Sequence, residues 1–313
     1  MTTPSVSPPS HAPAAAAGLP QSLAFVDGAI VPISEAKLSI LDWGFLHSDA
    51  TYDVAQVWDG RFFRLDDHLT RFEDGMANLR MSLPYSRAQI KQILVTLVQR
   101  SGLRNAYVEV ICTRGVPAPG SRDPRDCTNR FYAFAVPFVW IANPEQRERG
   151  LQLHVSEVRR IAPESVDPTV KNYHWLDLVR GLFDAYDHGQ ETAALSDGAG
   201  NVVEGAGFNV FAITDGIVVT PKDGVLRGVT RKTAMELAAK MGLRVEERAL
   251  PVQELELADE VFITSSAGGI MPVGWVNGVA IGKGGAGPET ASLRDAYWAL
   301  HSDPRYSFAV FKE

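Results

Sequence analysis

The stretch PTVKNYHWLDL, residues 168–178, places Lys171 between a short β-prone run and an apolar helical pattern. Residues 168–170 predict the end of a strand. Apolar side chains then recur at helical spacing and predict one wide apolar helix face, formed by Tyr173, Trp175, Leu176, Val179, Leu182 and Phe183. We expect a lysine at such a junction to be partly buried, which lowers its pKa and favours a nucleophilic amine. The competing interpretation is a lysine whose ammonium group reaches solvent past the start of a helix.

The composition indicates an ordinary globular protein of 313 residues, with 45% hydrophobic and 21% charged residues. This length suits two domains. The net charge of -7 without a basic block argues against a nucleic-acid partner. Cys112 and Cys127 are the only cysteines, so the chain has neither a disulfide framework nor a paired-cysteine zinc motif.

The hydropathy pattern contains no apolar run of the roughly 18 residues that cross a bilayer. The first residues lack the charged start and apolar core of a signal peptide. We therefore expect a cytoplasmic protein without a membrane partner.

The sequence predicts an α+β fold in two domains, because turn-linked strands alternate irregularly with helices. Residues 1–21, rich in Pro, Ser and Ala, are expected to be a disordered tail. Residues 22–140 form a small N-terminal domain, 141–149 a polar linker and 150–313 a large cofactor-binding domain.

Local signals divide the first domain into elements. Asp27-Gly28 and Asp59-Gly60 predict two hairpins, and residues 40–50 between them predict a loop. A first helix starts with Asp66 or Asp67 as its N-cap, and a second runs from Ser86 to a stop at Gly102. Residues 106–115 and 130–140 predict strands.

Two stretches of the second domain have the features of phosphate-binding sites. In LRGVTRKTAMELAAK, residues 226–240, Val229 and Thr230 enter a helix with Thr230 as the N-cap candidate, and free amides at a helix start attract anions. In TSSAGG, residues 264–269, Ser265 and Ser266 offer hydroxyls beside two glycines. Arg71, from the first domain, can add a charge-assisted bond to the same phosphate, although a surface arginine is the alternative.

Glu204 lies at a strand end between apolar runs, and a buried acid there needs a partner. An arginine or a protonated ring nitrogen would serve. A lysine amine, a phosphate cup and an acid opposite a pyridine nitrogen together predict pyridoxal 5'-phosphate as cofactor.

The chain resembles the fold-type IV pyridoxal-phosphate aminotransferases, which include branched-chain and D-amino-acid aminotransferases. The resemblance is carried, in the family's order, by HSDATYDV, DGRFFRLDDHLTRF, VKNYHW, VVEGAGFNVF, GVLRGVTRK and TSSAGGIMPV. It implies a small α/β domain and a larger domain built on a pseudo-barrel of mixed strands. It also implies that Lys171 binds the cofactor covalently, that Glu204 pairs with its ring nitrogen, and that the phosphate is held by Arg71, Val229, Thr230 and Ser266.

Within that family the sequence is most similar to the (R)-selective amine transaminases, in FLHSDATYDVAQVWDGRFFRLDDHLTRF, AYVEVICTRG and VKNYHWLDLVRGLF. The resemblance implies a substrate pocket lined by His47, Tyr52, Val54, Tyr107, Glu109 and Trp175. The loop after Gly115 lacks the Arg-x-His pair with which D-amino-acid aminotransferases hold a carboxylate. Arg122 is the candidate cation for a keto acid, and an exposed loop arginine is the alternative.

The expected reaction is a ping-pong transfer of an amino group from a primary amine to a keto acid such as pyruvate. Lys171 moves the proton of the substrate Cα as base and acid. The cofactor face from which the family's lysine works implies (R) selectivity when the larger substituent is confined to one pocket. The alternatives are a D-amino-acid or branched-chain amino-acid aminotransferase, or a non-catalytic cofactor-binding protein. The family implies a homodimer with its active site at the interface. The partner chain then contributes His47 and the loop around Arg122 to the site.

Overall fold

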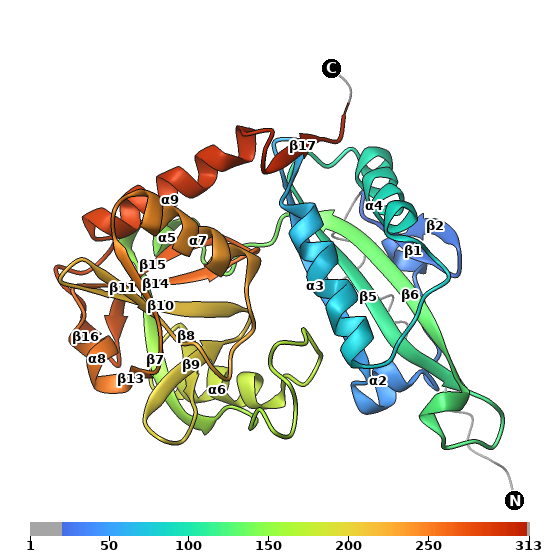
Figure 1. The fold of residues 1–313 in the computed structure, drawn as a ribbon, viewed down its shortest axis with the longest axis horizontal. Helices are drawn as coiled ribbons and strands as arrows, with labels where there is room; N and C mark the ends of the chain where they lie inside the picture. Colours follow the sequence, from blue (N-terminus) through green and yellow to red (C-terminus); the bar gives the residue numbers. More distant parts are fainter. Residues whose placement is uncertain (1–20, 312–313) are drawn as a thin grey trace, which may run out of the picture.

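The computed structural model describes residues 21–311 (Figure 1), so the predicted tail, 1–21, lies outside the described residues except for its last position. Six strands from the first half of the chain and one from its end form a seven-stranded antiparallel sheet in the order β17-β4-β3-β5-β6-β1-β2. Its strands are β1 (Leu23–Val26), β2 (Ala29–Pro32), β3 (Ala50–Trp58), β4 (Arg61–Phe63), β5 (Ala106–Pro117), β6 (Cys127–Pro137) and β17 (Ser307–Ala309). Both predicted hairpins form, with left-handed Asp27 and Asp59 in the turns.

Helices α3 (Leu65–Asn78) and α4 (Arg87–Ser101) cover one face of this sheet. Phe72 of α3 and Leu97 of α4 are fully buried against Val57 and Val108 of the sheet. The predicted limits of α4 are confirmed, because Ser86 forms a capping box and Gly102 ends the helix in a left-handed conformation. The predicted N-cap of α3 is wrong: Arg64 occupies that position, and Asp66 and Asp67 lie in the first turn.

The second half forms a ten-stranded mixed sheet, in which β9 also pairs with β10. That pairing closes a six-stranded barrel, β10-β14-β15-β7-β8-β9, which confirms the expected pseudo-barrel. The pairs β15–β7 and β7–β8 are parallel, and the other barrel pairs are antiparallel. The strands are β7 (Leu151–Arg159), β8 (Thr192–Ser196), β9 (Asn201–Gly205), β10 (Phe208–Thr214), β11 (Ile217–Thr220), β12 (Arg244–Glu247), β13 (Leu250–Pro251), β14 (Glu260–Ser265), β15 (Gly269–Val276) and β16 (Val279–Ala280).

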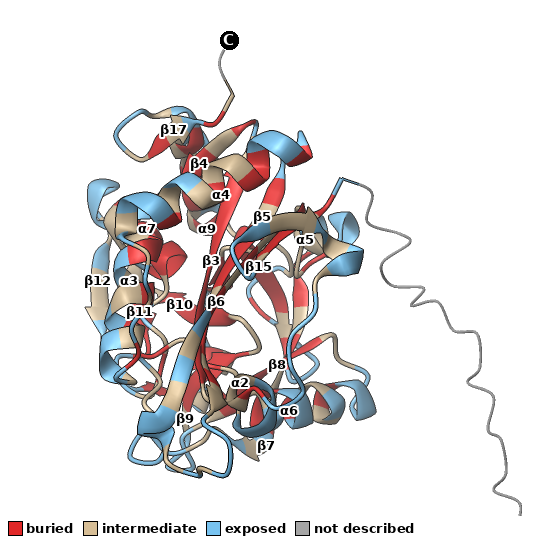
Figure 2. Ribbon diagram, turned by 90° about the vertical axis from the view of Figure 1, so that its right-hand side faces the viewer, coloured by how far each residue is buried: buried red, intermediate tan, exposed pale blue. Residues whose placement is uncertain are grey.

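Apolar side chains fill the barrel, and Leu153, Val210, Ile263 and Val273 are completely buried. Outside it lie α6 (Leu176–Asp187), α7 (Val229–Lys240), α8 (Val252–Glu256) and α9 (Pro288–Ala299), with 3-10 turns η1 (Ile33–Glu35), η2 (Pro124–Asp126) and η3 (Leu300–Ser302) elsewhere in the chain. Figure 2 shows that the buried residues gather on the strands and on the inner faces of the helices.

Two segments expected to be irregular contain short helices. Residues 40–50 include α2 (Trp43–His47), because the Asp42 side chain accepts a hydrogen bond from the Gly44 amide and caps it. Residues 141–149 include α5 (Pro144–Arg149), capped by Asn143 with Gln146 in a capping box.

The stretch around Lys171 also differs from expectation. Residues 168–170 form a turn instead of a strand end. Helix α6 begins only at Leu176, and its predicted apolar face points outward: Leu176 is 80% exposed and Phe183 is 63% exposed. Leu178, Gly181 and Ala185 face the barrel, and at Gly181 the contact is close, since an added Cβ would lie 2.6 Å from the Leu195 side chain.

The chain returns to the first sheet at its end, where β17 pairs with β4. The sequence did not indicate this strand, and the domain limits drawn from it stay a prediction. No helix within residues 21–311 is long and apolar enough to cross a membrane.

Candidate active site

A cavity of about 490 Å³ lies between the uncovered face of the first sheet and one end of the barrel. Side chains alternate along a strand, so one face of β3, β5 and β6 packs on α3 and α4 while the other faces the cavity. The antiparallel register places Val54, Glu109 and Phe134 in one row across these strands. Tyr52 and Tyr107 lie on the same face and also line the cavity.

Lys171 lies where the two halves of the molecule meet. Its carbonyl accepts hydrogen bonds from the Tyr52 amide and the Thr51 hydroxyl of β3, both at 3.0 Å. Its half-buried side chain lines the cavity, with Nζ 4.5 Å from the centre of the Tyr52 ring. Burial, and next the charge of Arg71, lower the pKa of Lys171 to about 8. A substantial fraction of its amine is therefore neutral near physiological pH.

Glu204 lies at the cavity end of β9 and is buried. Its carboxylate accepts hydrogen bonds from the Leu226 amide at 2.9 Å and from Arg160 Nε at 3.2 Å. Arg160 also donates to Asp177 of α6 at 2.7 Å, which ties the helix to the acid. Burial raises the pKa of Glu204, whereas Arg160 opposes that shift.

The start of α7 also lines the cavity. Gly228 is its N-cap, so the prediction of Thr230 as N-cap is wrong; Thr230 is buried in the first turn. No side chain caps this helix, and the first amides of a helix have no partner within it. Val229, Thr230, Ser265 and Ser266 all line the cavity here. Within residues 21–311, the neighbouring Thr264 hydroxyl is buried without a hydrogen-bond partner, so this part of the cavity has unused polar groups suited to an anion.

Arg71 reaches the cavity from α3 and is held by Asp53. Asp53 accepts from Arg71 Nε at 2.7 Å and Nη2 at 2.9 Å, and it lies 2.8 Å from His68 Nδ1. Burial alone would raise the pKa of Asp53, but the charge of Arg71 and the bond to His68 lower it well below its usual value. Burial lowers the pKa of His68, so its ring is neutral and donates to Asp53.

Glu109 places an acidic group in the sheet face of the cavity. Its carboxylate accepts hydrogen bonds from Tyr173 at 2.6 Å and Tyr107 at 3.2 Å. The Tyr173 ring stacks on Tyr52 with centroids 4.4 Å apart. Burial raises the pKa of Glu109, and the bond from Tyr173 opposes that shift.

The structure brings together all the predicted site residues except two. Trp175 and Val54 line the cavity with those above, whereas His47 and Arg122 do not. Both are exposed, His47 at the end of α2 and Arg122 in the loop between β5 and β6.

The sequence reasoning missed the supporting polar groups Asp53, His68, Arg160 and Tyr173. An acidic residue inside the apolar pattern of β3 is a signal that could have identified Asp53. His68 and Arg71 lie three residues apart, a spacing that puts both on one helix face. Nothing local marks Arg160, because its partners come from β9 and α6.

The fold and the cavity define the class of protein. A mixed barrel beside an α/β half, with a lysine of lowered pKa, a buried acid and an anion-binding helix start around one cavity, suits the aldehyde, ring nitrogen and phosphate of pyridoxal 5'-phosphate. The protein is a fold-type IV, pyridoxal-phosphate-dependent enzyme.

Comparisons with known proteins give the family. Residues 50–275 match the family model of the class IV amino-transferases, and the chain belongs to that family. It is 31% identical over 292 residues to a putative branched-chain-amino-acid aminotransferase of Methanocaldococcus jannaschii, covering 92% of this chain and 99% of the relative. It is 28% identical over 281 residues to the branched-chain-amino-acid aminotransferase of Escherichia coli K12, covering 88% and 91%.

Solved structures agree with this placement. The branched-chain amino acid aminotransferase of Escherichia coli superposes with a TM-score of 0.87 and 25% identity, covering 92% of this chain and 99% of that one. The branched-chain amino acid aminotransferase of Thermobaculum terrenum, in its PLP-containing holo form, gives a TM-score of 0.84 and 26% identity, covering 94% and 99%. The chain is therefore a pyridoxal-phosphate-dependent aminotransferase that acts on small amino and keto compounds.

Proposed function

We propose that this aminotransferase is an (R)-selective amine transaminase, which takes the amino group from a primary amine without a neighbouring carboxylate and gives it to a keto acid such as pyruvate. The observation that carries the proposal is Glu109 in the wall of the cavity. An amino-acid substrate brings a carboxylate, which needs donors or a cation, and Glu109 offers only acceptor oxygens when ionised.

The cations of the cavity wall support the same conclusion. Among the cavity-lining residues within 21–311, the two arginines are Arg71 and Arg160, and each is already paired with buried acids. Lys171 is the reactive amine. The cavity of one chain thus presents no uncommitted guanidinium to a substrate carboxylate, whereas its aromatic and aliphatic wall suits an apolar amine.

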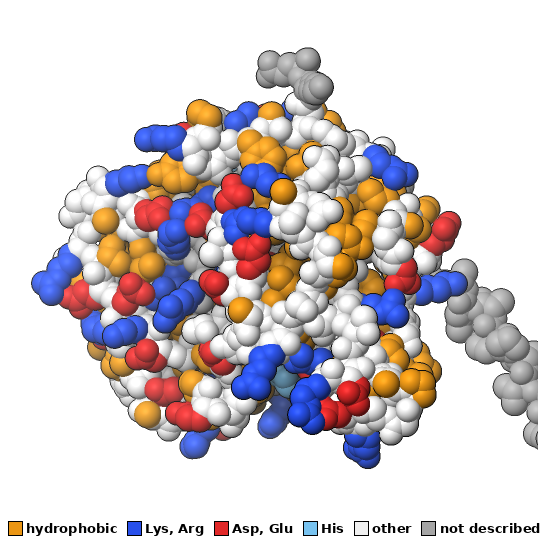
Figure 3. All heavy atoms as spheres, turned by 45° about the vertical axis from the view of Figure 1, so that its right-hand side comes forward, with side chains coloured by type: hydrophobic (Ala, Val, Ile, Leu, Met, Phe, Trp, Pro, Cys, Tyr) orange, Lys and Arg blue, Asp and Glu red, His pale blue; other side chains and the backbone are white. Residues whose placement is uncertain are grey.

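The keto acid of the second half-reaction still needs a countercharge. We assign it to Arg122 of the partner subunit in a homodimer, with His47 completing the partner's pocket, since both side chains lie outside their own cavity. Exposed apolar side chains support the dimer: Ile40 is 72% and Phe45 is 65% exposed, and Leu176 and Phe183 extend the exposed apolar surface on α6. Figure 3 shows one face of the molecule, on which hydrophobic side chains lie exposed between charged ones.

The proposed roles of the other residues follow from their positions. When bound, pyridoxal phosphate supplies an aldehyde that captures amines and a ring that withdraws electrons. Lys171 anchors it and, as a neutral amine, accepts and returns the substrate proton through Nζ. Glu204 holds a proton on the ring nitrogen, with Arg160 fixing the orientation of the acid. Val229, Thr230, Ser265, Ser266 and Arg71 bind the phosphate. Trp175 and Tyr52 limit the space beside Lys171. The (R) preference follows if the larger substituent of the amine fits on only one side of the cavity.

A branched-chain amino-acid aminotransferase is the second candidate, because the relatives at 31% and 28% identity carry that name. It requires that the substrate carboxylate find donors in spite of Glu109.

The deciding experiment compares kcat/KM for (R)- and (S)-1-phenylethylamine, D-alanine and L-leucine, with pyruvate or 2-oxoglutarate as acceptor. The proposal predicts that the (R)-amine is fastest. Glu109→Gln keeps the shape of the side chain and removes its charge, so it should raise kcat/KM for L-leucine relative to kcat/KM for the (R)-amine. The exposed control Glu164→Gln should leave this ratio unchanged. Faster turnover of L-leucine by the native enzyme overturns the amine proposal in favour of the second candidate.

A further inference from the structure

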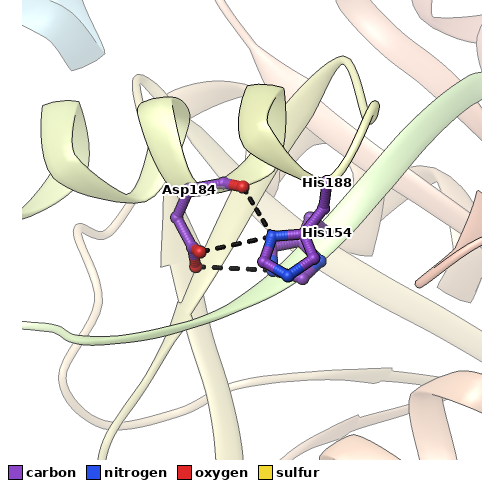
Figure 4. Close-up of side chains that lie close together, drawn as sticks. All are labelled: His154, Asp184 and His188. Carbon is purple, nitrogen blue, oxygen red and sulfur yellow. Dashed lines mark hydrogen bonds and ion pairs between the residues drawn. The ribbon is translucent and has the colours of Figure 1, made fainter.

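Two histidines and an aspartate meet outside the catalytic cavity, between α6 and the outer face of β7 (Figure 4). His154 projects from β7, and Asp184 and His188 lie one helical turn apart at the end of α6. One ligand atom from each lies within 4.8 Å of the other two. The imidazole rings of His154 and His188 stack with centroids 4.6 Å apart.

Each histidine lies close to the carboxylate of Asp184. His154 Nε2 lies 3.4 Å from Asp184 Oδ2, and His188 Nδ1 lies 3.4 Å from Asp184 Oδ1. Ligands bound to zinc at about 2.1 Å in a tetrahedron are separated by about 3.4 Å. The two separations in the cluster run to the two different oxygens of Asp184, and the three ligand atoms lie within 4.8 Å of one another, so small side-chain shifts must bring them around one ion.

The hydrogen bonding of His154 supplies an independent observation. Its side chain is only 12% exposed. Within residues 21–311, its Nε2 atom is buried and has no hydrogen-bond partner. Buried polar atoms in native proteins are almost always satisfied, so this nitrogen, directed at Asp184, calls for a ligand.

The neighbours of Asp184 and His188 also bear on metal binding. The Ser156 hydroxyl donates to Asp184 Oδ2, which orients the carboxylate and lowers the pKa of Asp184. His188 Nδ1 lies 2.8 Å from the Asp184 carbonyl, and its ring is 59% exposed. To bind a metal, His188 must give up that exposed hydrogen bond and turn out of its stack on His154, because an imidazole binds a metal in the plane of its ring.

We propose that His154, Asp184 and His188 form a binding site for a late divalent transition metal such as Zn²⁺, which joins the end of α6 to β7. Two neutral imidazoles and one carboxylate suit Zn²⁺ and exclude strong binding of Mg²⁺ or Ca²⁺, which prefer a full set of oxygen ligands. The fourth position is open to solvent water. The site stabilises α6, whose Asp177 holds Arg160 at the cofactor acid.

The test titrates Zn²⁺ into the holoenzyme by calorimetry, after chelator treatment and removal of unbound pyridoxal phosphate. The native protein should bind one equivalent at this site. His188→Ala, an exposed position that leaves the fold intact, should abolish binding or weaken it by more than the about 10–100-fold expected for the second-shell variant Ser156→Ala. Asp187→Asn, an exposed neighbour on α6, is the matched control and should bind like the native enzyme.

Thermal unfolding gives a second readout. At free Zn²⁺ about 100-fold above its Kd, mass action should raise Tm by several degrees in the native protein and in Asp187→Asn, and not in His188→Ala. Absence of Zn²⁺ binding to the native protein, or equal binding by His188→Ala, overturns the proposal.

Discussion

Asp53→Asn tests how the cavity arginine is held. Asp53 is 1% exposed in the middle of β3 and contacts Arg71 through two hydrogen bonds of 2.7 and 2.9 Å. The substitution keeps the shape of the side chain but removes its charge. Arg71 then remains a buried cation beside a neutral amide, and His68 is neutral in both proteins because burial lowers its pKa.

The expected cost follows from this geometry. Two unit charges about 4 Å apart interact by about 4 kcal/mol at an effective dielectric constant of 20. Breaking a buried pair by removing one partner costs about 3–5 kcal/mol, because the remaining charge is uncompensated. We expect a loss of that size in the free energy of unfolding of the apoenzyme. The loss should be smaller with saturating pyridoxal phosphate, because the phosphate partly replaces the lost carboxylate beside Arg71.

Urea unfolding followed by tryptophan fluorescence measures both values. Asp67→Asn is the matched control: Asp67 bridges Arg64 and Lys232 at a side chain that is 33% exposed, and should contribute about 1 kcal/mol or less. The pKa of Asp53 is lowered by folding, so its stabilisation is complete above its unfolded pKa of about 3.9 and is lost as the pH falls through the folded value. The difference in the free energy of unfolding between Asp53→Asn and the native enzyme should be constant near neutral pH and should become smaller below about pH 4. A variant no less stable than Asp67→Asn refutes the reasoning.

Three further outcomes are expected. Capture of pyridoxal phosphate by the apoenzyme should accelerate as the pH rises through about 8, because the neutral amine of Lys171 is the nucleophile; stopped-flow absorbance measures it, and a rate independent of pH contradicts the assignment. Arg160→Met should cost about 3 kcal/mol in urea unfolding, because it leaves Glu204 and Asp177 buried without their cation, whereas the exposed Arg159→Met should cost little; equal stabilities contradict this. Trp175→Ala should raise kcat/KM for 1-(1-naphthyl)ethylamine relative to 1-phenylethylamine, because it widens the wall beside Lys171, and an unchanged ratio places Trp175 outside the substrate path.

Several local elements and the cofactor class could be predicted from the sequence alone. The hairpin turns at Asp27-Gly28 and Asp59-Gly60 and the limits of α4 follow from interactions within a few residues, which the sequence displays directly. The order of the family's motifs identified a pyridoxal-phosphate aminotransferase, and the comparisons confirm that family. They do not decide the donor, which stays a proposal.

Which side chains meet in the site depended on the tertiary fold. The carbonyl of Lys171 bonds to β3, 120 positions earlier in the chain, and Tyr52 of that strand lies beside its Nζ, a contact that the local sequence does not indicate. The predicted apolar stripe of α6 faces outward, whereas Leu178, Gly181 and Ala185 face the barrel, where an added Cβ on Gly181 would lie 2.6 Å from the Leu195 side chain.

The same cause explains the residues that sequence reasoning missed or misplaced. Arg160 pairs with acids from β9 and α6, and His154 meets Asp184 only because α6 crosses β7. The sequence predicts His47 and Arg122 in the substrate pocket, yet both are exposed and neither lines the cavity of its own chain. Periodicity and capping depend on neighbours along the chain, so a sequence displays them; a pairing between distant segments depends on strand register and helix packing, which exist only once the chain has folded.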